Sequence, residues 1–192
     1  MADVRLFLGF RVPLDLAENV LDQLGGVLEG TRVYAPGDLH VTLAFLGAWS
    51  GDRIADLKGA VQEELRGLPA PDLHLNGTGA FPDSSSARAL WARVEEADGT
   101  YGRLEAVVER CRQAARCLGW RPKRGEGRGP LRAHVTVARS GGLAAPLTPG
   151  FEVAQPRGAW IAQDVALFES TPDHPEQRYV VHATWPLVVR PG

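Results

Sequence analysis

Lysine is nearly absent from this chain of 192 residues: Lys58 and Lys123 are the only two, and the other side chains counted as Lys or Arg are arginines. The formal net charge is −2, which excludes a protein that binds polyanions through a large excess of positive charge. Arginine presents a planar fork of N–H donors that matches the oxygen atoms of a phosphate. Individual arginines beside a cleft therefore matter more for function than the total charge.

Cysteine and long apolar runs are also scarce. The two cysteines, Cys111 and Cys117, lie on different faces of one predicted helix, which argues against a mutual disulfide and favours core or near-core positions. No apolar run reaches the length of a membrane-spanning helix. Residues 1–12 alternate like a strand and lack the apolar stretch of a signal peptide. We therefore expect a cytoplasmic protein, and its 44% of hydrophobic residues is enough for a packed core.

Two short segments of the chain are near copies of each other: His40-Val41-Thr42-Leu43 and His134-Val135-Thr136-Val137. Each lies in an apolar run that predicts a strand, residues 40–46 and 133–139. Because residues two apart in a strand share a face, the histidine and the threonine of each motif point the same way. Two such faces brought together offer two imidazoles and two hydroxyls, which are groups suited to acid–base chemistry on a phosphate.

The opposite faces of these strands are predicted to be core. In the first strand Val41, Leu43 and Phe45 point away from the motif, as do Val135 and Val137 in the second. A single motif of this kind would more simply be a half-buried histidine on a strand with its hydrogen bonds satisfied. Two copies in matched strands, about half the chain apart, favour a functional pair.

Hydrophobic periodicity predicts three amphipathic helices, at residues 14–28, 52–68 and 101–118. Predicted strands occupy residues 5–12, 40–46, 73–78, 89–95, 133–139, 160–169 and 179–185. Several strands lie close enough along the chain to form hairpins, which favours an α+β fold with antiparallel sheets. The spacing of the two motifs indicates an internal duplication, with two lobes that each give one strand to a shared cleft.

At these motifs the chain resembles the 2H phosphoesterases, and within that superfamily the bacterial and archaeal RNA 2′,3′-cyclic phosphodiesterases, also called 2′-5′ RNA ligases. The paired His-x-Thr motifs are the specific part of the resemblance, which runs along most of the chain. Where the family has a proline before the second histidine, this chain has Ala133. Further similar segments are residues 36–39, 44–47 and 133–139, Arg5-Leu6-Phe7-Leu8, Gly79-Ala80-Phe81-Pro82 and residues 165–170.

The resemblance implies an α+β, bilobal fold with two pseudo-symmetric lobes, antiparallel sheets flanking a central cleft, and helices outside. Residues 1–192 would form one domain of two intertwined lobes, one carrying the His40 motif and the other the His134 motif. It further implies hydrolysis of 2′,3′-cyclic phosphate ends of RNA without a metal or other cofactor, with His40 as general acid and His134 as general base. The acid and base roles would exchange in the reverse direction, an ATP-independent ligation.

Further residues are expected to bind the substrate. Thr42 and Thr136 would donate hydrogen bonds to the phosphate oxygens, and Arg139 is the phosphate contact that the resemblance implies. Strict alternation puts Arg139 on the face opposite His134, so either the strand bends or the side chain reaches round its end. An ordinary surface arginine at the end of the strand is the alternative.

A basic loop precedes the second motif and is a candidate contact for the RNA backbone, although a solvated loop would look the same. Phe81, and less strongly Tyr34, are candidates to stack on a base; a cap over the core is the alternative for Phe81. The basic residues of the loop are Arg121, Lys123, Arg124, Arg128 and Arg132.

The main chemical alternative is a metal site, but the five histidines show none of the local clustering typical of zinc ligands, so no metal is expected. Two other functions remain open: a related enzyme that acts on a small cyclic nucleotide or on an ADP-ribose cyclic phosphate, and a non-catalytic module that binds RNA or nucleotides. We expect a monomer with no membrane contact and no obligate protein partner.

Overall fold

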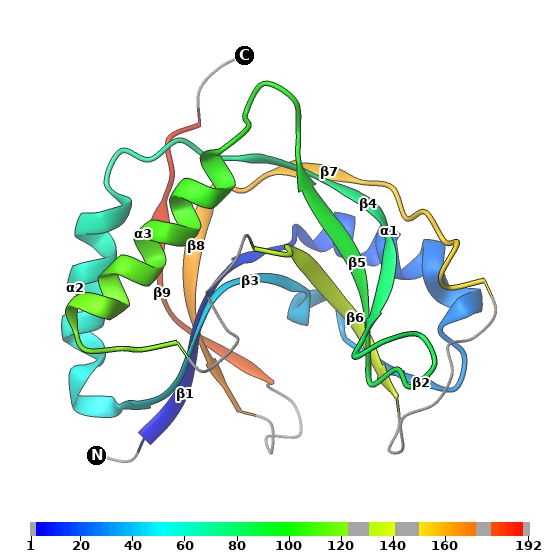
Figure 1. The fold of residues 1–192 in the computed structure, drawn as a ribbon, viewed down its shortest axis with the longest axis horizontal. Coiled ribbons are helices and arrows are strands. Elements are labelled where there is room, and N and C mark those ends of the chain that lie inside the picture. The colour runs from blue at the N-terminus through cyan, green and yellow to red at the C-terminus, as the bar shows by residue number, and fades with distance from the viewer. Residues whose placement is uncertain (1–2, 123–130, 141–149, 172–177, 190–192) are drawn as a thin grey trace.

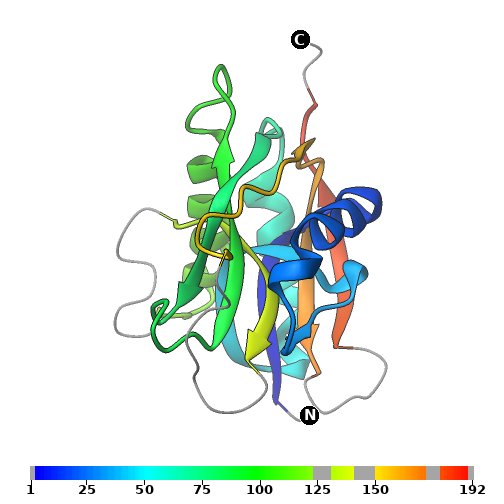
Figure 2. The same cartoon turned by 90° about the vertical axis from the view of Figure 1, so that its right-hand side faces the viewer.

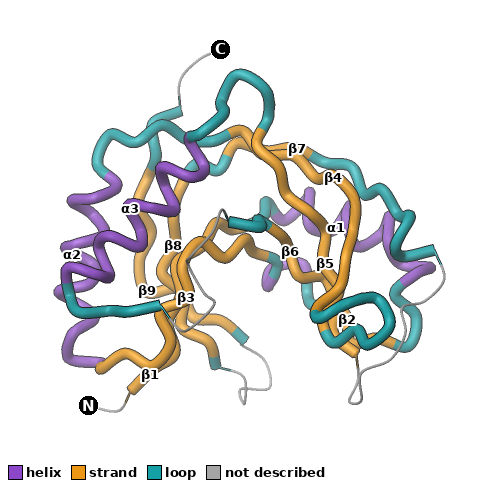
Figure 3. Tube along the Cα trace, viewed as in Figure 1, coloured by secondary structure: helices purple, strands orange, loops and turns teal. Residues whose placement is uncertain are grey.

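The computed structural model describes residues 3–122, 131–140, 150–171 and 178–189. These residues contain nine strands and three α-helices, with short 3₁₀ helices at Gly25–Val27, Pro36–Asp38 and Gly51–Arg53 (Figure 3). The elements are β1 (Asp3–Arg11), α1 (Leu14–Leu24), β2 (Thr31–Val33), β3 (His40–Ser50), α2 (Ile54–Leu65), β4 (Asp72–Phe81), β5 (Ala89–Glu96), α3 (Arg103–Cys117), β6 (His134–Ser140), β7 (Ala159–Ile161), β8 (Asp164–Ser170) and β9 (Tyr179–Pro186).

The strands form one sheet in the order β7-β4-β5-β6-β3-β1-β8-β9, with β2 beside β6. Every pairing between these strands is antiparallel. One half of the sheet consists of β7, β4, β5, β6 and β2, and the other of β3, β1, β8 and β9. The halves meet where Val41 of β3 pairs with Val135 of β6. The predicted α+β fold with antiparallel strands is confirmed, and its two expected sheets are joined into one.

The helices lie outside the sheet (Figures 1 and 2). Helices α2 and α3 cover the half that contains β3 and β1, while α1 covers the half that contains β4 and β5. Each helix buries an apolar stripe, such as Leu57, Val61 and Leu65 of α2. Helix α1 follows β1 and helix α3 follows β5, yet each helix covers the half of the sheet opposite to the strand before it. Within the part of the chain that the structure describes, no helix is long and apolar enough to cross a bilayer.

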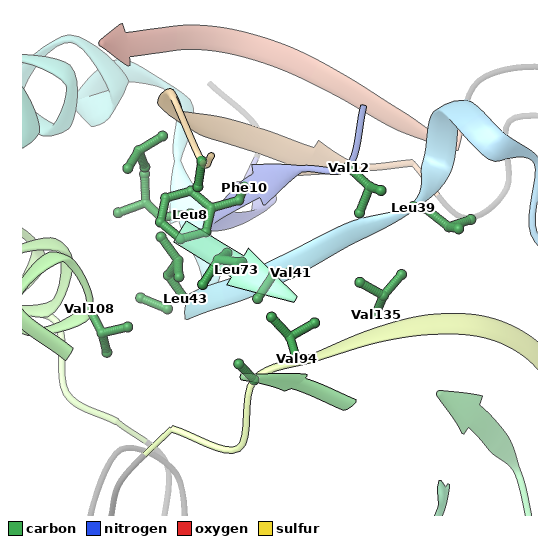
Figure 4. Close-up of a cluster of buried hydrophobic side chains, with 14 of the residues drawn as sticks. Leu8, Phe10, Val12, Leu39, Val41, Leu43, Leu73, Val94, Val108 and Val135 are labelled. Atoms are coloured by element: carbon green, nitrogen blue, oxygen red, sulfur yellow. The ribbon is translucent and has the colours of Figure 1, made fainter. Parts of the chain in front are cut away.

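A single large hydrophobic core draws on both halves of the sheet. Figure 4 shows Leu43 and Val41 of β3 close to Val135 of β6 and to Val108 of α3. Cys111 of α3 is also fully buried, and burial raises the pKa of its thiol to about 12, so this cysteine is an inert core residue. The predicted near-core position of Cys117 is wrong, because its side chain is exposed.

A β-bulge in β3 reverses the alternation of its side chains. The register shifts between Leu8 and Gly9 of β1, so Leu43 is left without an opposite residue and both Leu43 and Ala44 are buried. Phe45 consequently turns to the face of the two motif side chains and is only half-buried. The predicted core position of Phe45 is therefore wrong, because the extra residue moves its side chain to the other face.

A second bulge lies in β4, between Leu75 and Thr78. Gly77 adopts a φ of +83° there, a left-handed conformation that glycine tolerates without strain. The strand continues past this bulge to Phe81, whereas the sequence predicted its end at residue 78. Phe81 is consequently paired with Ala89 of β5 and held at the end of a strand.

Candidate active site

A cavity of about 560 Å³ lies where the two halves of the sheet meet, and both motifs line it. The predicted meeting of His40 with His134 and of Thr42 with Thr136 is therefore observed. The remaining lining comes mainly from aromatic and arginine side chains. The lining residues are Arg5, Phe7, Tyr34, His40, Thr42, Phe45, His134, Thr136, Arg139, Ser170, Arg178 and Tyr179.

The two histidines are held in the same way. Nδ1 of His40 donates a hydrogen bond to the carbonyl oxygen of Asp38 at 2.7 Å, and Nδ1 of His134 donates to that of Arg132 at 2.8 Å. In each case the acceptor lies two residues before the histidine. Because a carbonyl only accepts, Nδ1 carries the hydrogen and the Nε2 atom of each neutral ring is left to exchange protons with a ligand.

The ring of His40 is enclosed by aromatic side chains. Its centroid lies 4.7 Å from that of Phe7, 4.8 Å from that of Tyr179 and 5.6 Å from that of Phe168. Tyr179 meets the imidazole at an interplanar angle of 78°, so the two rings are nearly perpendicular. These contacts fix the plane of the imidazole and keep water from most of its surface.

Burial lowers the pKa of His40 below its ordinary value of 6.5, because the charged ring loses hydration. The hydrogen bond to the Asp38 carbonyl acts in the opposite direction, and the nearby positive charge of His134 adds to the lowering. The charge of His134 thus reaches the ring of His40, although burial remains the largest cause of the shift.

His134 lies in a more open environment beside a second cavity of about 500 Å³. Its ring packs at 5.1 Å against Phe81 and at 5.8 Å against Trp91, measured between centroids. Arg93 and Arg132 line the same second cavity. The second histidine therefore borders both cavities, whereas His40 faces only the first.

A bulge also decides the position of Arg139. The register between β5 and β6 shifts at Val137, which turns Arg139 to the face of His134. Of the two geometries considered for this residue, the structure has the bent strand. The Nε atom of Arg139 donates a hydrogen bond to the hydroxyl of Tyr34 at 2.7 Å, and both side chains line the first cavity.

Tyr34 also supports a second arginine. The guanidinium of Arg178 lies 4.6 Å from the centroid of the Tyr34 ring, a cation–π contact, and its Nε lies 3.9 Å from Oδ2 of Asp38. Burial raises the pKa of the Asp38 carboxyl, and the charge of Arg178 partly offsets this. Burial and the neighbouring Tyr34 hydroxyl raise the pKa of Tyr179, so its phenol stays protonated.

Residues 13–174 match the family model of the 2′-5′ RNA ligase superfamily. The chain belongs to this superfamily. An RNA 2′,3′-cyclic phosphodiesterase of Archaeoglobus fulgidus is 31% identical over 140 residues, which are 71% of this chain and 72% of the relative.

Solved structures of similar proteins agree with this 2′-5′ RNA ligase superfamily member on the fold. A crystal structure of a Thermus thermophilus protein covers 95% of this chain and 97% of its own, with a TM-score of 0.74 and 25% identity. Escherichia coli LigT complexed with 3′-AMP covers 96% of this chain and 98% of its own, with a TM-score of 0.75 and 22% identity. At this level of identity the LigT likeness shows the fold alone.

Tyr34 and Phe81, the two residues predicted to stack on a base, lie in different surroundings in this superfamily member. Tyr34 is 8% exposed, its hydroxyl is occupied by Arg139 and one face by Arg178. Tyr34 thus supports two arginines in the structure, and its contact with a base stays a prediction. Phe81 lines the second cavity, so its contact with a base stays a prediction.

The predicted basic loop is only partly described. Lys123, Arg124 and Arg128 lie outside the described residues. Arg121 is exposed and donates a hydrogen bond to the carbonyl of Trp120 at 2.9 Å. Arg132 lines the second cavity and anchors His134 through its carbonyl. RNA contact by this loop stays a prediction.

Several residues of the cavity had no signal in the sequence. Tyr179 reaches His40, and Arg178 reaches Tyr34, only because β9 pairs with β8 and β8 with β1. Phe45 was assigned to the core, since alternation alone gives no sign of a bulge. Among the described residues, no group of three or more histidine, cysteine, aspartate or glutamate side chains is arranged to hold a metal ion.

Proposed function

We propose that this protein hydrolyses the 2′,3′-cyclic phosphate ends of RNA to 2′-phosphates, without a metal or other cofactor. The observation that carries the proposal is the pair of imidazoles with identical Nδ1 anchoring in one cavity. The relative from Archaeoglobus fulgidus is named RNA 2′,3′-cyclic phosphodiesterase, which supports the same substrate class here.

The reaction needs two proton transfers at one phosphorus. Water attacks the phosphorus in line with the departing 3′-oxygen, one imidazole takes a proton from the water, and the other gives a proton to the leaving oxygen. A P–O bond to water forms as the P–O3′ bond breaks, and a 2′-phosphate remains. Two Nε2 atoms facing one cavity supply both transfers near neutral pH, where imidazole titrates.

We assign His40 as the general acid and His134 as the general base. The enclosed ring of His40 has a lowered pKa, which makes its protonated form the stronger proton donor for a poor leaving group. His134 borders the open second cavity, from which water can approach. The reverse of the same step would join the cyclic end to a 5′-hydroxyl without ATP, and bulk water favours hydrolysis.

Charge on the non-bridging oxygens grows as the phosphorus becomes five-coordinate. We assign its stabilisation to the hydroxyls of Thr42 and Thr136 and to the guanidinium of Arg139, which all line the cavity. Arginine binds phosphate oxygens through two donors at once, and Tyr34 occupies only the Nε donor of Arg139. The two terminal nitrogens of Arg139 remain to donate hydrogen bonds to the phosphate of the substrate.

We infer that residues 1–192 form one domain of two intertwined lobes, because one core draws on both halves of the sheet. We further propose that the protein acts as a monomer in the cytoplasm. Light scattering coupled to size exclusion tests the monomer directly.

The decisive experiment follows an oligoribonucleotide that ends in a 2′,3′-cyclic phosphate, with EDTA present. His40→Ala and His134→Ala should each lower turnover by at least about 100-fold, the size expected for loss of a general acid or base. His74→Ala is the matched control, because His74 lies on β4 and lines neither cavity. Unchanged turnover in either motif variant, or loss of wild-type turnover in EDTA, would contradict the proposal. Binding without turnover would indicate a non-catalytic module.

A further inference from the structure

Arg178 gives the cavity more positive charge than one cyclic phosphate requires. A cyclic phosphodiester carries a single negative charge, and its transition state gains about one more. Arg139 and one imidazolium already balance that charge. Arg178 and Arg5 also line the cavity, so a ligand with a single phosphate leaves them without an anionic partner from the substrate.

The side chain of Arg178 is held in position by its neighbours, but its positive charge is only weakly neutralised by them. Its guanidinium lies 4.6 Å from the centroid of the Tyr34 ring, and the side chain as a whole is 23% exposed. Its carboxylate neighbour, Asp38, lies at 3.9 Å, the outer limit of an ion pair, so most of the donors of Arg178 are not used by it. An arginine ordered in this way on an aromatic face is prepared to bind an anion.

Tyr34 holds two of the arginines that line the cavity, Arg139 and Arg178, on one ring. Its hydroxyl accepts the hydrogen bond from Arg139, and its face carries Arg178. Two like charges are therefore kept at separate, fixed positions on the same wall of the cavity. Such an arrangement fits two anionic groups at a fixed spacing better than one group bound twice.

We propose that Arg178 binds a second phosphate of the substrate, attached to the 5′-oxygen of the nucleotide whose cyclic phosphate lies between the histidines. The inference rests on the proposed function and narrows its substrate class. In RNA this second phosphate is the diester that links the terminal nucleotide to the preceding one. In a small nucleotide it is a 5′-phosphate or a pyrophosphate. Tyr34 is a positioning residue for both arginines.

The test compares four substrates: adenosine 2′,3′-cyclic phosphate, its 5′-phosphorylated form, the dinucleotide ApA with a 2′,3′-cyclic phosphate, and the same dinucleotide with an uncharged methylphosphonate linkage. Wild-type kcat/KM should be about 10- to 100-fold higher for the dinucleotide with the charged linkage than for the uncharged one, the range of a charged hydrogen bond. Preference for the 5′-phosphorylated mononucleotide alone would assign the second phosphate to a small nucleotide.

Arg178→Gln should remove most of the preference for the charged linkage, and Arg178→Lys should retain part of it. Arg66→Gln is the matched control, since Arg66 is exposed and paired with Glu63 at 2.6 Å. No preference in the wild-type enzyme, or an undiminished preference in Arg178→Gln, would overturn the inference. The wild-type comparison holds even if a variant fails to fold.

The two proposals fail in different ways. A wild-type protein that turns over none of the four substrates contradicts the proposed function itself. A protein that hydrolyses adenosine 2′,3′-cyclic phosphate, gains nothing from a 5′-phosphate on it, and treats charged and uncharged dinucleotides alike contradicts only the role of Arg178.

Discussion

Val41 and Val135 face each other at the residue pair that joins the two halves of the sheet. In an antiparallel pair this register sets the position of His40 beside that of Thr136, and the position of Thr42 beside that of His134. Both valines are buried, with exposures of 0% and 2%. The relative position of the two imidazoles thus depends on an apolar contact directly behind them.

We expect Val135→Ala to lower both stability and turnover. Loss of two buried methyl groups should cost about 2 kcal/mol in the free energy of unfolding and let the strands shift. Urea denaturation and kcat on a cyclic-phosphate substrate measure the two effects. Val181→Ala serves as the control, because Val181 lies on β9 and is 42% exposed. A variant with reduced stability and an unchanged kcat would show that the contact does not position the histidines.

The lowered pKa of His40 predicts that the protein loses stability in mild acid. In the unfolded chain this ring takes up a proton near its ordinary pKa of 6.5, whereas the folded protein resists protonation until a lower pH. The stabilisation that comes from keeping His40 neutral in the folded protein is therefore fully present above pH 6.5. It is lost as the pH falls from 6.5 through the lower pKa of His40 in the folded protein. Urea unfolding at pH 7.5 and pH 5.5 should show a smaller decrease in His40→Gln than in the wild type. An equal decrease in both proteins would contradict the burial effect.

Turnover should follow a bell-shaped dependence on pH. The base must be neutral and the acid protonated, so kcat/KM falls on both sides of an optimum. Initial rates between pH 4.5 and 9 measure the profile, and a flat profile would argue against paired imidazoles.

Tyr34→Phe should weaken catalysis through Arg139. The substitution removes the acceptor of the 2.7 Å hydrogen bond and keeps the ring beneath Arg178. We expect kcat/KM to fall about tenfold for every substrate, with the preference for a second phosphate retained, because an unpaired donor costs about 1–3 kcal/mol. Tyr101→Phe is the control, since Tyr101 is 94% exposed. Loss of the second-phosphate preference in Tyr34→Phe would show that the hydroxyl also positions Arg178.

Gly79→Ala should displace Trp91 from its place beside His134. A Cβ atom at residue 79 would lie 2.3 Å from the Trp91 ring, so the indole must move. We expect a loss of about 1–3 kcal/mol in stability and a lower kcat. In Gly59→Ala of α2 the added methyl meets nothing within 4 Å, so that control should gain about 0.5–1 kcal/mol. Wild-type values in Gly79→Ala would indicate that Trp91 moves freely.

Much of the fold could be predicted from local patterns. The paired motifs, the apolar stripes of the helices and the antiparallel class follow from periodicity, which each segment carries by itself. The bulges at Leu43 and Val137 could not be predicted, because an extra residue in a strand depends on its partner strands. These bulges decide which face of the sheet Phe45 and Arg139 lie on. The predicted face of Phe45 was therefore wrong, and two geometries stayed open for Arg139.

The rest of the site depends on contacts between distant segments. Nothing in the local sequence of Tyr34 indicates that Arg139 and Arg178 meet on its ring, since these residues come from the end of β2, from β6 and from the residue before β9. Long-range pairing of this kind is set by the whole sheet, not by any single segment. The histidines and threonines of the site could thus be predicted from the two motifs. The contacts that hold Arg139 and Arg178 in place could not.

The contact between Tyr179 and His40 has a consequence for biosynthesis. The first histidine emerges from the ribosome early, yet the ring that closes over it belongs to one of the last strands to be made. A nascent chain that stops before β9 would carry both motifs and still leave this imidazole open to water. The aromatic enclosure of His40 is therefore complete only once β9 has paired with β8.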